Sequence, residues 1–287
     1  MSHIRLIISS VTAILCIFNA WAILPSEAYF QNEELDTVRI NSILVKAVLI
    51  RNPQERVATI GKEFIGTPYV ANTLDSEPER LTINIEGLDC TTFVENTLAL
   101  AYTAGEGRSS WRDYVINLEK IRYRNGVMSD YASRLHYISD WIIDNTHRGI
   151  IKEYTTHMPI NDWQIKTLDF MSSNRDKYSA LKDSSQYSRV KSYEIGYRNH
   201  RFPYIKTGRL SNKAIIAALK DGDIIAITTK VPGLDVSHMG ILIKKDGIPY
   251  LMHASSKEGA VVIDKQPLAE YLHRTGGTGI RVIRLEE

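Results

Sequence analysis

The chain has 287 residues and is 44% hydrophobic, so it can bury a substantial core and does not have the composition of a disordered protein. Its 35 basic and 33 acidic residues give a net charge of +2 and are dispersed along the chain. This distribution excludes the concentrated basic surface that nucleic-acid binding requires. The length fits one large domain or two small ones.

The first 22 residues have the pattern of a secretory signal peptide. Arg5 precedes an apolar run at 6–18, and the small residues Ala20 and Ala22 follow it. The run is short for a transmembrane helix. If the protein is attached to a membrane, we expect the attachment to be an uncleaved signal anchor. Cys16 does not follow a small residue, which argues against lipid attachment. We therefore expect an exported monomer in the periplasm or cell envelope.

Helical patterning follows the signal and strand patterning closes the chain. Apolar spacing predicts helices at 36–48, 53–64, from Cys90 to about 104, within 109–146 (the second of them at about 131–145), at 161–182 and at 211–219. Trp163, Leu168 and Met171 are expected to face inward. The polar segment 183–208 is interpreted as a long surface loop. Short β-type runs are expected at 223–227, 239–244, 248–252, 260–263 and 279–285.

Cys90 is the only cysteine beyond the first thirty residues, and it stands at the predicted start of a helix. Gly87 ends the preceding segment, and Asp89 or Thr91 can cap the helix. The unpaired N–H groups at a helix N-terminus favour a thiolate, so we expect this position to lower the thiol pKa and to make Cys90 a nucleophile. The alternative is a small buried side chain without a chemical role.

Two histidines stand near the open ends of a predicted hairpin. Asp246-Gly247 is the turn signal, and a two-residue turn places position 255 opposite His238. His253 is then a diagonal neighbour of His238 on the same face, about 7–8 Å away between Cα atoms. One imidazole can accept the thiol proton while the other orients it. Gly240 is expected to leave this face open to substrate.

Two other interpretations of these residues stay open. The histidines can be unrelated side chains at strand ends. One thiolate and two imidazoles can also bind zinc with an open position, but the sequence has no His-Glu-x-x-His or Cys-x-x-Cys pair with close ligand spacing. We therefore predict a site without a metal or other cofactor.

Five short motifs occur in an order that is specific as a set. They are Gly66-Thr67-Pro68-Tyr69, Asp89-Cys90-Thr91-Thr92-Phe93, Gly222-Asp223-Ile224, Ser237-His238-Met239-Gly240-Ile241 and Met252-His253-Ala254-Ser255. The set resembles the motifs of the NlpC/P60 cysteine peptidases, which cut bacterial cell-wall peptides. The resemblance implies an α+β, papain-like fold, with a nucleophile helix packed on a small antiparallel sheet. It also implies one catalytic domain at 30–287 with a helical insertion at about 109–208.

Two segments narrow the resemblance to one branch. The run Gly-Leu-Asp-Cys-Thr-Thr-Phe-Val-Glu at 87–95 and the run Ser133-Arg134-Leu135-His136-Tyr137 resemble a branch once named DUF1460. Its characterised members are N-acetylmuramoyl-L-alanine amidases that act on muropeptides and prefer anhydro-sugar fragments. The resemblance extends from about residue 53 to the C-terminus.

The resemblance also implies a role for each matched residue. Cys90 is the nucleophile, His238 the general base and His253 its orienter, and Tyr69 contributes a hydroxyl near the oxyanion. Peptidoglycan fragments are the expected partner. The candidate substrate contacts are Asp89, Thr91, Arg134, His136 and Ser237, of which Arg134 and His136 are expected to be exposed.

The chain departs from the usual NlpC/P60 pattern at two places. Thr91-Thr92 replaces the Ser-Gly pair after the cysteine, and the double glycine that usually follows Pro-Tyr is missing. These differences argue against γ-D-glutamyl-diamino acid endopeptidase activity, which stays the enzymatic alternative. A non-catalytic muropeptide-binding protein is the alternative from a different functional class.

Overall fold

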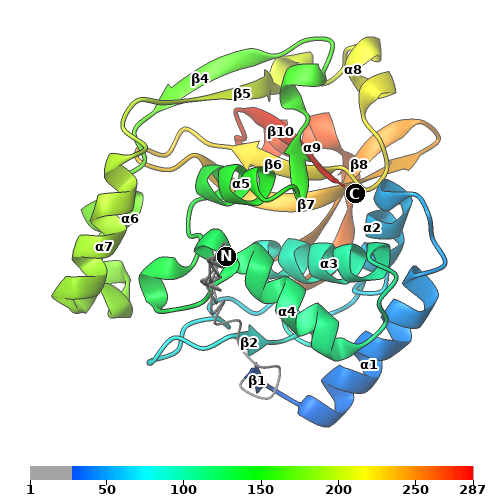
Figure 1. Cartoon of the computed structure of the whole chain (residues 1–287). Coiled ribbons are helices and arrows are strands. Elements are labelled where there is room, and N and C mark those ends of the chain that lie inside the picture. Colours follow the sequence, from blue (N-terminus) through cyan, green and yellow to red (C-terminus); the bar gives the residue numbers. More distant parts are fainter. Residues whose placement is uncertain (1–27, 287) are drawn as a thin grey trace, which may run out of the picture.

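An antiparallel sheet forms the centre of the computed structural model, which describes residues 28–286. Eight strands form it in the order β4-β5-β10-β6-β7-β8-β9, with β3 paired to β10 beside that path (Figure 1). A two-stranded parallel sheet joins β1 and β2. The signal peptide expected at 1–22 and Cys16 lie outside the described residues. The strands are β1 Tyr29–Phe30, β2 Thr82–Ile83, β3 Ile151–Glu153, β4 Asp162–Lys166, β5 His200–Lys206, β6 Ile224–Thr228, β7 Val236–Lys245, β8 Ile248–Ser255, β9 Ala260–Pro267 and β10 Gly279–Leu285.

Helices cover both faces of the sheet. Helices α1 to α4 lie together on one side of it, and α3 contacts β7 and β8 (Figure 1). Helix α9 packs against β8 and β9. Helices α6 and α7 stand apart at one side of the molecule (Figure 1). The helices are α1 Glu33–Ala47, α2 Pro53–Lys62, α3 Cys90–Gly105, α4 Trp111–Arg122, α5 Ile138–His147, α6 Phe170–Ser173, α7 Ser184–Ile195, α8 Lys213–Ala218 and α9 Leu268–Thr275.

Strand β7 separates the core into two layers because successive side chains point to opposite faces. Met239 and Ile241 pack in one apolar cluster with α2 and α3, while Leu242 packs in a second cluster with α9. Phe93 of α3 meets Phe64 edge-on, with ring centroids 6.2 Å apart. This packing holds the N-terminal end of α3 beside β7.

The strands predicted for the C-terminal part are confirmed. Strand β10 has its predicted bounds, and β7, β8 and β9 extend beyond theirs. The helices predicted at 36–48, 53–64, from Cys90 and at 211–219 are also confirmed, with ends shifted by a small number of residues.

The single helix predicted for 161–182 is wrong. Its first part is strand β4, which pairs with β5. Trp163 does not point inward: it is 48% exposed and packs against the guanidinium of Arg201. The ammonium of Lys166 donates to three carbonyls of the β6–β7 loop. These partners lie far along the chain, so local periodicity does not contain them.

The second helix within 109–146 begins later than predicted. The segment at 131–133 forms a 3-10 turn, Arg134 then bridges to the end of α4, and α5 begins only at Ile138. No side chain next to α5 caps it; the amide of Ser139 instead donates to the carboxylate of Asp235, 2.5 Å away. A distant residue therefore sets where this helix starts.

The loop predicted for 183–208 is also wrong, because the segment forms α7 and β5. Asp183 caps α7 by accepting from the amides of Ser185 at 2.7 Å and Gln186 at 3.0 Å. Only Val190 and Glu194 of this helix are buried, so its apolar face is too sparse to produce a periodic pattern. The segment 109–208 thus contributes strands β3 to β5 as well as helices.

Candidate active site

Cys90 is the first residue of α3, as predicted. Asp89 is the N-cap and accepts from the amide of Thr92 at 2.8 Å, while the hydroxyl of Thr92 accepts from the amide of Asp89 at 2.8 Å. This reciprocal capping box explains the threonine that stands where the NlpC/P60 pattern has glycine. Thr91 does not cap the helix and leaves its side chain half-buried beside the sulfur.

The expected fall in the thiol pKa is not found. Burial raises the pKa of Cys90 to about 11, the charge of Asp89 adds to the rise, and the backbone of Met239 and the hydroxyl of Thr91 oppose it. Burial is the main cause because it disfavours the charged thiolate, and the carboxylate of Asp89, at the positive end of the helix dipole, adds to the effect. The resting thiol is therefore neutral, and a base has to remove its proton.

The predicted hairpin register is confirmed. Strands β7 and β8 pair from Ile241 opposite Met252 to Lys245 opposite Ile248, around a turn in which Asp246 and Gly247 have positive φ. The sum of paired numbers is constant in an antiparallel ladder, so this register places position 255 level with position 238.

The two predicted histidines are in direct contact at the ends of these strands. Nε2 of His238 lies 2.7 Å from Nδ1 of His253, and the rings are nearly perpendicular with centroids 4.9 Å apart. Burial and the neighbouring His253 lower the pKa of His238 to about 3. Burial also lowers the pKa of His253, although Asp264 opposes this effect. Both imidazoles are neutral at neutral pH, so His238 has one unprotonated nitrogen.

Sequence reasoning missed the residues behind His253. Asp264 is buried on β9 with Oδ2 3.7 Å from Nε2 of His253, and Arg274 of α9 donates to the same oxygen at 2.9 Å. The ring of Tyr271 lies 5.2 Å from that of His253. In the β8–β9 register, Val262 pairs with His253, so Asp264 is a diagonal neighbour of His253. The sequence does not predict this contact, because no two-residue turn fixes the register between β8 and β9.

Tyr69 lies on an extended segment between β9 and the start of α3. Its amide donates to Gly259 at 2.8 Å, and the next amide donates to Leu88 at 3.1 Å. Burial raises the pKa of Tyr69, and the nearby Cys90 and Asp89 add to the rise. The hydroxyl therefore stays protonated and can donate a hydrogen bond.

Gly240 does not leave an open surface, contrary to expectation. It is buried, and a Cβ at this position would lie 2.7 Å from Cδ1 of Leu251 and from the carbonyl oxygen of Met252. The glycine is required because β8 and its side chains approach β7 closely here.

A cavity of about 350 Å³ adjoins the start of α3. Four of the five predicted substrate contacts line it: Asp89, Thr91, Arg134 and His136. Ser237 is outside this set and lies exposed beside His238 on β7. The remaining lining residues are Asn72, Leu74, Asp75, Glu95, Tyr131, Leu135, Lys177, Tyr178 and Ser179.

The cavity wall is more buried than the sequence indicates. Arg134 is only 7% exposed and pairs with Asp75 at 3.3 Å and Glu79 at 3.5 Å. Burial, with the charge of Arg134, lowers the pKa of His136 to about 3. Nε2 of the neutral ring lies 2.8 Å from the carbonyl oxygen of Tyr131, which makes Nε2 the donor and Nδ1 an acceptor.

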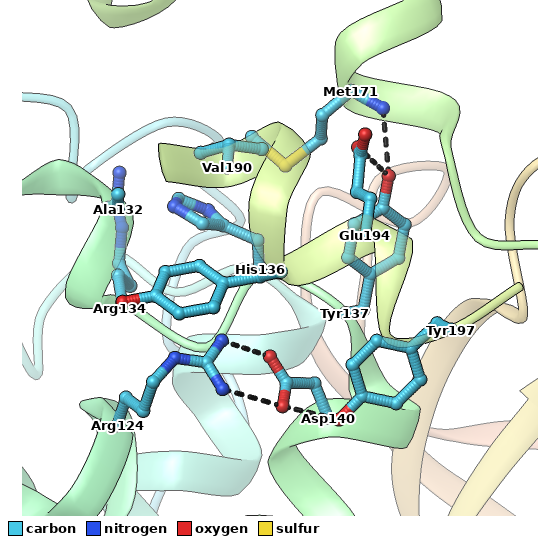
Figure 2. A pocket seen from close by; sticks show the side chains of 11 residues that line it. Arg124, Ala132, Arg134, His136, Tyr137, Asp140, Met171, Val190, Glu194 and Tyr197 are labelled. Atoms are coloured by element: carbon cyan, nitrogen blue, oxygen red, sulfur yellow. Dashed lines mark hydrogen bonds and ion pairs between the residues drawn. The ribbon is translucent and has the colours of Figure 1, made fainter. Parts of the chain in front are cut away.

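A polar network lies near Arg134 and His136, and Figure 2 shows the hydrogen bonds and ion pairs within it. Arg124 donates hydrogen bonds from two nitrogens to the carboxylate of Asp140, and the hydroxyl of Tyr197 donates to the same carboxylate at 2.6 Å. Tyr137 donates to Glu194 of α7 at 2.7 Å. The space between these groups is about 10 Å³, close to the minimum for one water molecule. Tyr137, at the end of the segment 134–137, is thereby joined to α7.

The family model of AmiA-like proteins, described as N-acetylmuramoyl-L-alanine amidase-like, matches residues 59–280. The chain belongs to the AmiA-like family. Its role is accordingly that of a hydrolase of the peptidoglycan amidase-like kind. The matched range contains Cys90, both histidines and the cavity wall.

Solved structures agree with the family. An N-acetylmuramoyl-L-alanine amidase from Bacteroides uniformis ATCC 8492 has 38% identity and a TM-score of 0.76, with 82% of this chain and 99% of that chain covered. A Bacteroides fragilis protein with a provisional name as a xylanase has 41% identity and a TM-score of 0.73, covering 79% and 100%. A DUF1460 protein from Legionella pneumophila strain Philadelphia 1, at 23% identity, 89% and 96% coverage and a TM-score of 0.70, shares the fold. No curated protein matches.

Two further findings concern the described part of this AmiA-like protein. Between residues 28 and 286, no helix has the length and apolar character of a membrane-spanning segment. In the same segment, no three His, Cys, Asp or Glu side chains converge in an arrangement that could hold a metal ion.

Proposed function

We propose that this AmiA-like protein is an exported, cysteine-dependent N-acetylmuramoyl-L-alanine amidase of the papain-like NlpC/P60 type. It cleaves the amide between the lactyl group of muramic acid and L-alanine in muropeptides, including anhydro forms. The observation that carries the proposal is the placement of Cys90 at the start of α3, against β7, where His238 and His253 lie 2.7 Å apart.

The first half-reaction forms a thioester. The unprotonated nitrogen of His238 takes the thiol proton as the sulfur of Cys90 attacks the lactyl carbonyl carbon. The carbonyl oxygen becomes an oxyanion, and the amide of Cys90 and the hydroxyl of Tyr69 donate hydrogen bonds to it. The charged His238 then gives its proton to the nitrogen of L-alanine, the carbon–nitrogen bond breaks, and the peptide leaves with a free amine.

The second half-reaction consumes one water molecule. His238, neutral again, takes a proton from water while the hydroxyl oxygen attacks the thioester carbon. The carbon–sulfur bond breaks, the sulfur of Cys90 recovers the proton from His238, and the muramic acid leaves with its lactyl carboxylic acid. A resting state in which Cys90 and His238 are both neutral suits this cycle, because the thiol then holds the proton that the leaving amine needs.

The cavity next to Cys90 supports the choice of substrate. Its volume of about 350 Å³ is within the range of pockets for small ligands. Lys177 supplies positive charge for a carboxylate of an acidic stem peptide, and Arg134, which is paired with Asp75 and Glu79, has its guanidinium at the same wall. Nδ1 of His136 and the hydroxyl of Thr91 supply polar contacts for the amides of the peptide. Asp89 and Ser237 directly precede the reacting residues Cys90 and His238 along the chain.

Mass spectrometry of muropeptides, with and without the anhydro sugar, tests the proposal. Wild-type protein should release a peptide that begins at L-alanine together with the muramic sugar, and Cys90→Ala and His238→Ala should not. His273→Ala removes an exposed histidine on α9 and is the matched control.

The other outcomes assign other functions. Cleavage between D-glutamate and the diamino acid would keep the mechanism and replace the specificity. Binding without cleavage would indicate a muropeptide-binding protein, and release of sugars from xylan would favour the xylanase name of the Bacteroides fragilis protein. Activity that a chelator abolishes, with zinc found in the purified protein, would favour a metal mechanism.

A further inference from the structure

Asp264 is held rigidly behind the histidine pair. Its Oδ1 accepts from the amide of Gln266 at 2.8 Å, and its Oδ2 accepts from Arg274 at 2.9 Å. Arg274 is itself fixed by a hydrogen bond to the side chain of Gln266 at 2.5 Å and lies over the ring of Tyr271. Both oxygens of Asp264 thus accept hydrogen bonds, so the carboxylate has a fixed orientation.

Nε2 of His253 is the group that this carboxylate faces. The nitrogen is buried and has no hydrogen-bond partner within the described residues, and Oδ2 of Asp264 lies 3.7 Å from it. That distance is too long for a hydrogen bond, so the interaction at rest is electrostatic. An anion at this position favours an N–H on Nε2 of His253 and disfavours a lone pair there.

The choice at His253 fixes the choice at His238. If Nε2 of His253 carries the proton, its Nδ1 is an acceptor, and the contact of 2.7 Å requires an N–H on Nε2 of His238. The other nitrogen of His238, Nδ1, is then unprotonated and can take the thiol proton. With the opposite arrangement, Nδ1 of His238 carries a proton and the ring cannot accept one there.

We propose that Asp264, held by Arg274, is a positioning residue that selects the tautomers of His253 and His238 in which His238 can act as a base. The proposal rests on the proposed function for its role in catalysis, whereas the tautomers themselves do not depend on any substrate. When His238 becomes charged, Asp264 also stabilises that charge through His253, as the third group of a catalytic triad does.

Nuclear magnetic resonance of ¹⁵N-labelled histidines tests the tautomers directly at pH 7.5. In wild-type protein, His253 and His238 should both carry the proton on Nε2. Asp264→Asn places an amide in the same space without the charge, and both rings should shift toward the Nδ1–H form. Wild-type His253 protonated on Nδ1, or unchanged tautomers in Asp264→Asn, would overturn the proposal.

Kinetics with a muropeptide give the second reading. Asp264→Asn should lower kcat about 100-fold with KM nearly unchanged, because a misplaced tautomer affects only the proton transfer. The pH profile of kcat should also shift in Asp264→Asn, because the variant removes one of the groups that surround His253. These groups are His238 on β7, Asp264 on β9, Arg274 and Tyr271 on α9, and Glu258 in the β8–β9 turn.

Two further variants keep the test decisive if Asp264→Asn is unstable. Arg274→Gln loosens the carboxylate from a partly exposed position and should lower kcat several-fold in the same direction. Glu270→Gln removes an exposed carboxylate from α9 that has no contact with His253 and is the matched control with unchanged kcat. Correct wild-type tautomers without muropeptide cleavage would reject the proposed function and leave the positioning role standing.

Discussion

Nε2 of His238 and Nδ1 of His253 lie 2.7 Å apart across a hairpin whose turn is Asp246-Gly247. The contact joins two strands that also form the middle of the core. The thiol of Cys90 lies against the backbone of Met239, the residue after His238, so α3 and the sheet bring the proposed nucleophile and the proposed base close together. Rigid elements of this kind are suited to placing reacting groups precisely.

Alkylation of Cys90 should respond to pH as a buried thiol does. Because its pKa is raised to about 11, the reactive thiolate is scarce at neutral pH and becomes more abundant as pH rises. The rate with iodoacetamide should increase about 100-fold between pH 7 and pH 9 in a Cys16→Ser background, with Cys90→Ser as the unreactive control. A rate that reaches its plateau below pH 8 would contradict the raised pKa and favour a preformed thiolate.

Arg134→Lys should weaken substrate binding more than chemistry. Lysine keeps the charge but cannot reach both Asp75 and Glu79, which the guanidinium contacts at 3.3 and 3.5 Å. We expect KM for a muropeptide to rise about tenfold with kcat changed less than about twofold. Arg148→Lys is the matched control, because its partner Asp144 lies away from the cavity. An unchanged KM would remove Arg134 from the set of substrate contacts.

Stability should fall as the solution is acidified below the ordinary histidine pKa. Burial lowers the pKa of His136 and of His238 from 6.5 to about 3, so between these values the unfolded chain binds more protons than the folded one. The free energy of unfolding therefore rises with pH through this window. The stabilising contribution of the two neutral histidines is complete above about pH 6.5. Denaturant titrations between pH 4 and pH 7 measure the slope.

A histidine variant separates this effect from that of the carboxylates. His136→Gln should reduce the slope by about one proton, while His273→Gln, at an exposed position, should leave it unchanged. Equal slopes in both variants and in wild-type protein would show that His136 is not a buried neutral group.

Breaking the ion pair beneath α3 should be costly. Nε of Arg122 donates to Glu95 at 2.7 Å and its Nη1 to the carbonyl of Thr82 at 2.8 Å, with both charged side chains almost fully buried. Arg122→Met leaves a buried carboxylate unpaired and should lower the free energy of unfolding by about 3–5 kcal/mol. The double variant Arg122→Met with Glu95→Leu should recover most of it, and a loss below about 1 kcal/mol in the single variant would contradict this account.

Local sequence signals predicted the β7–β8 hairpin and the start of α3, where the partners lie close along the chain, but they missed α7, whose buried face is too sparse to produce a periodic pattern. The Asp246-Gly247 turn fixes the β7–β8 register, and with it the meeting of His238 and His253, because an antiparallel hairpin leaves no freedom once its turn is set. Asp89 likewise predicts the start of α3, because the amide that it caps lies only three residues away. Motif resemblance alone supplied the proposed role of Tyr69, for which no local pattern exists.

Only the tertiary structure decided what depends on distant partners and on burial. Strand β4, the late start of α5 at its Asp235 cap and the approach of Asp264 to His253 all join segments whose spacing the sequence leaves free. The thiol pKa of Cys90 also turned on burial, because the desolvation of a charge depends on everything packed around it and not on the neighbours along the chain.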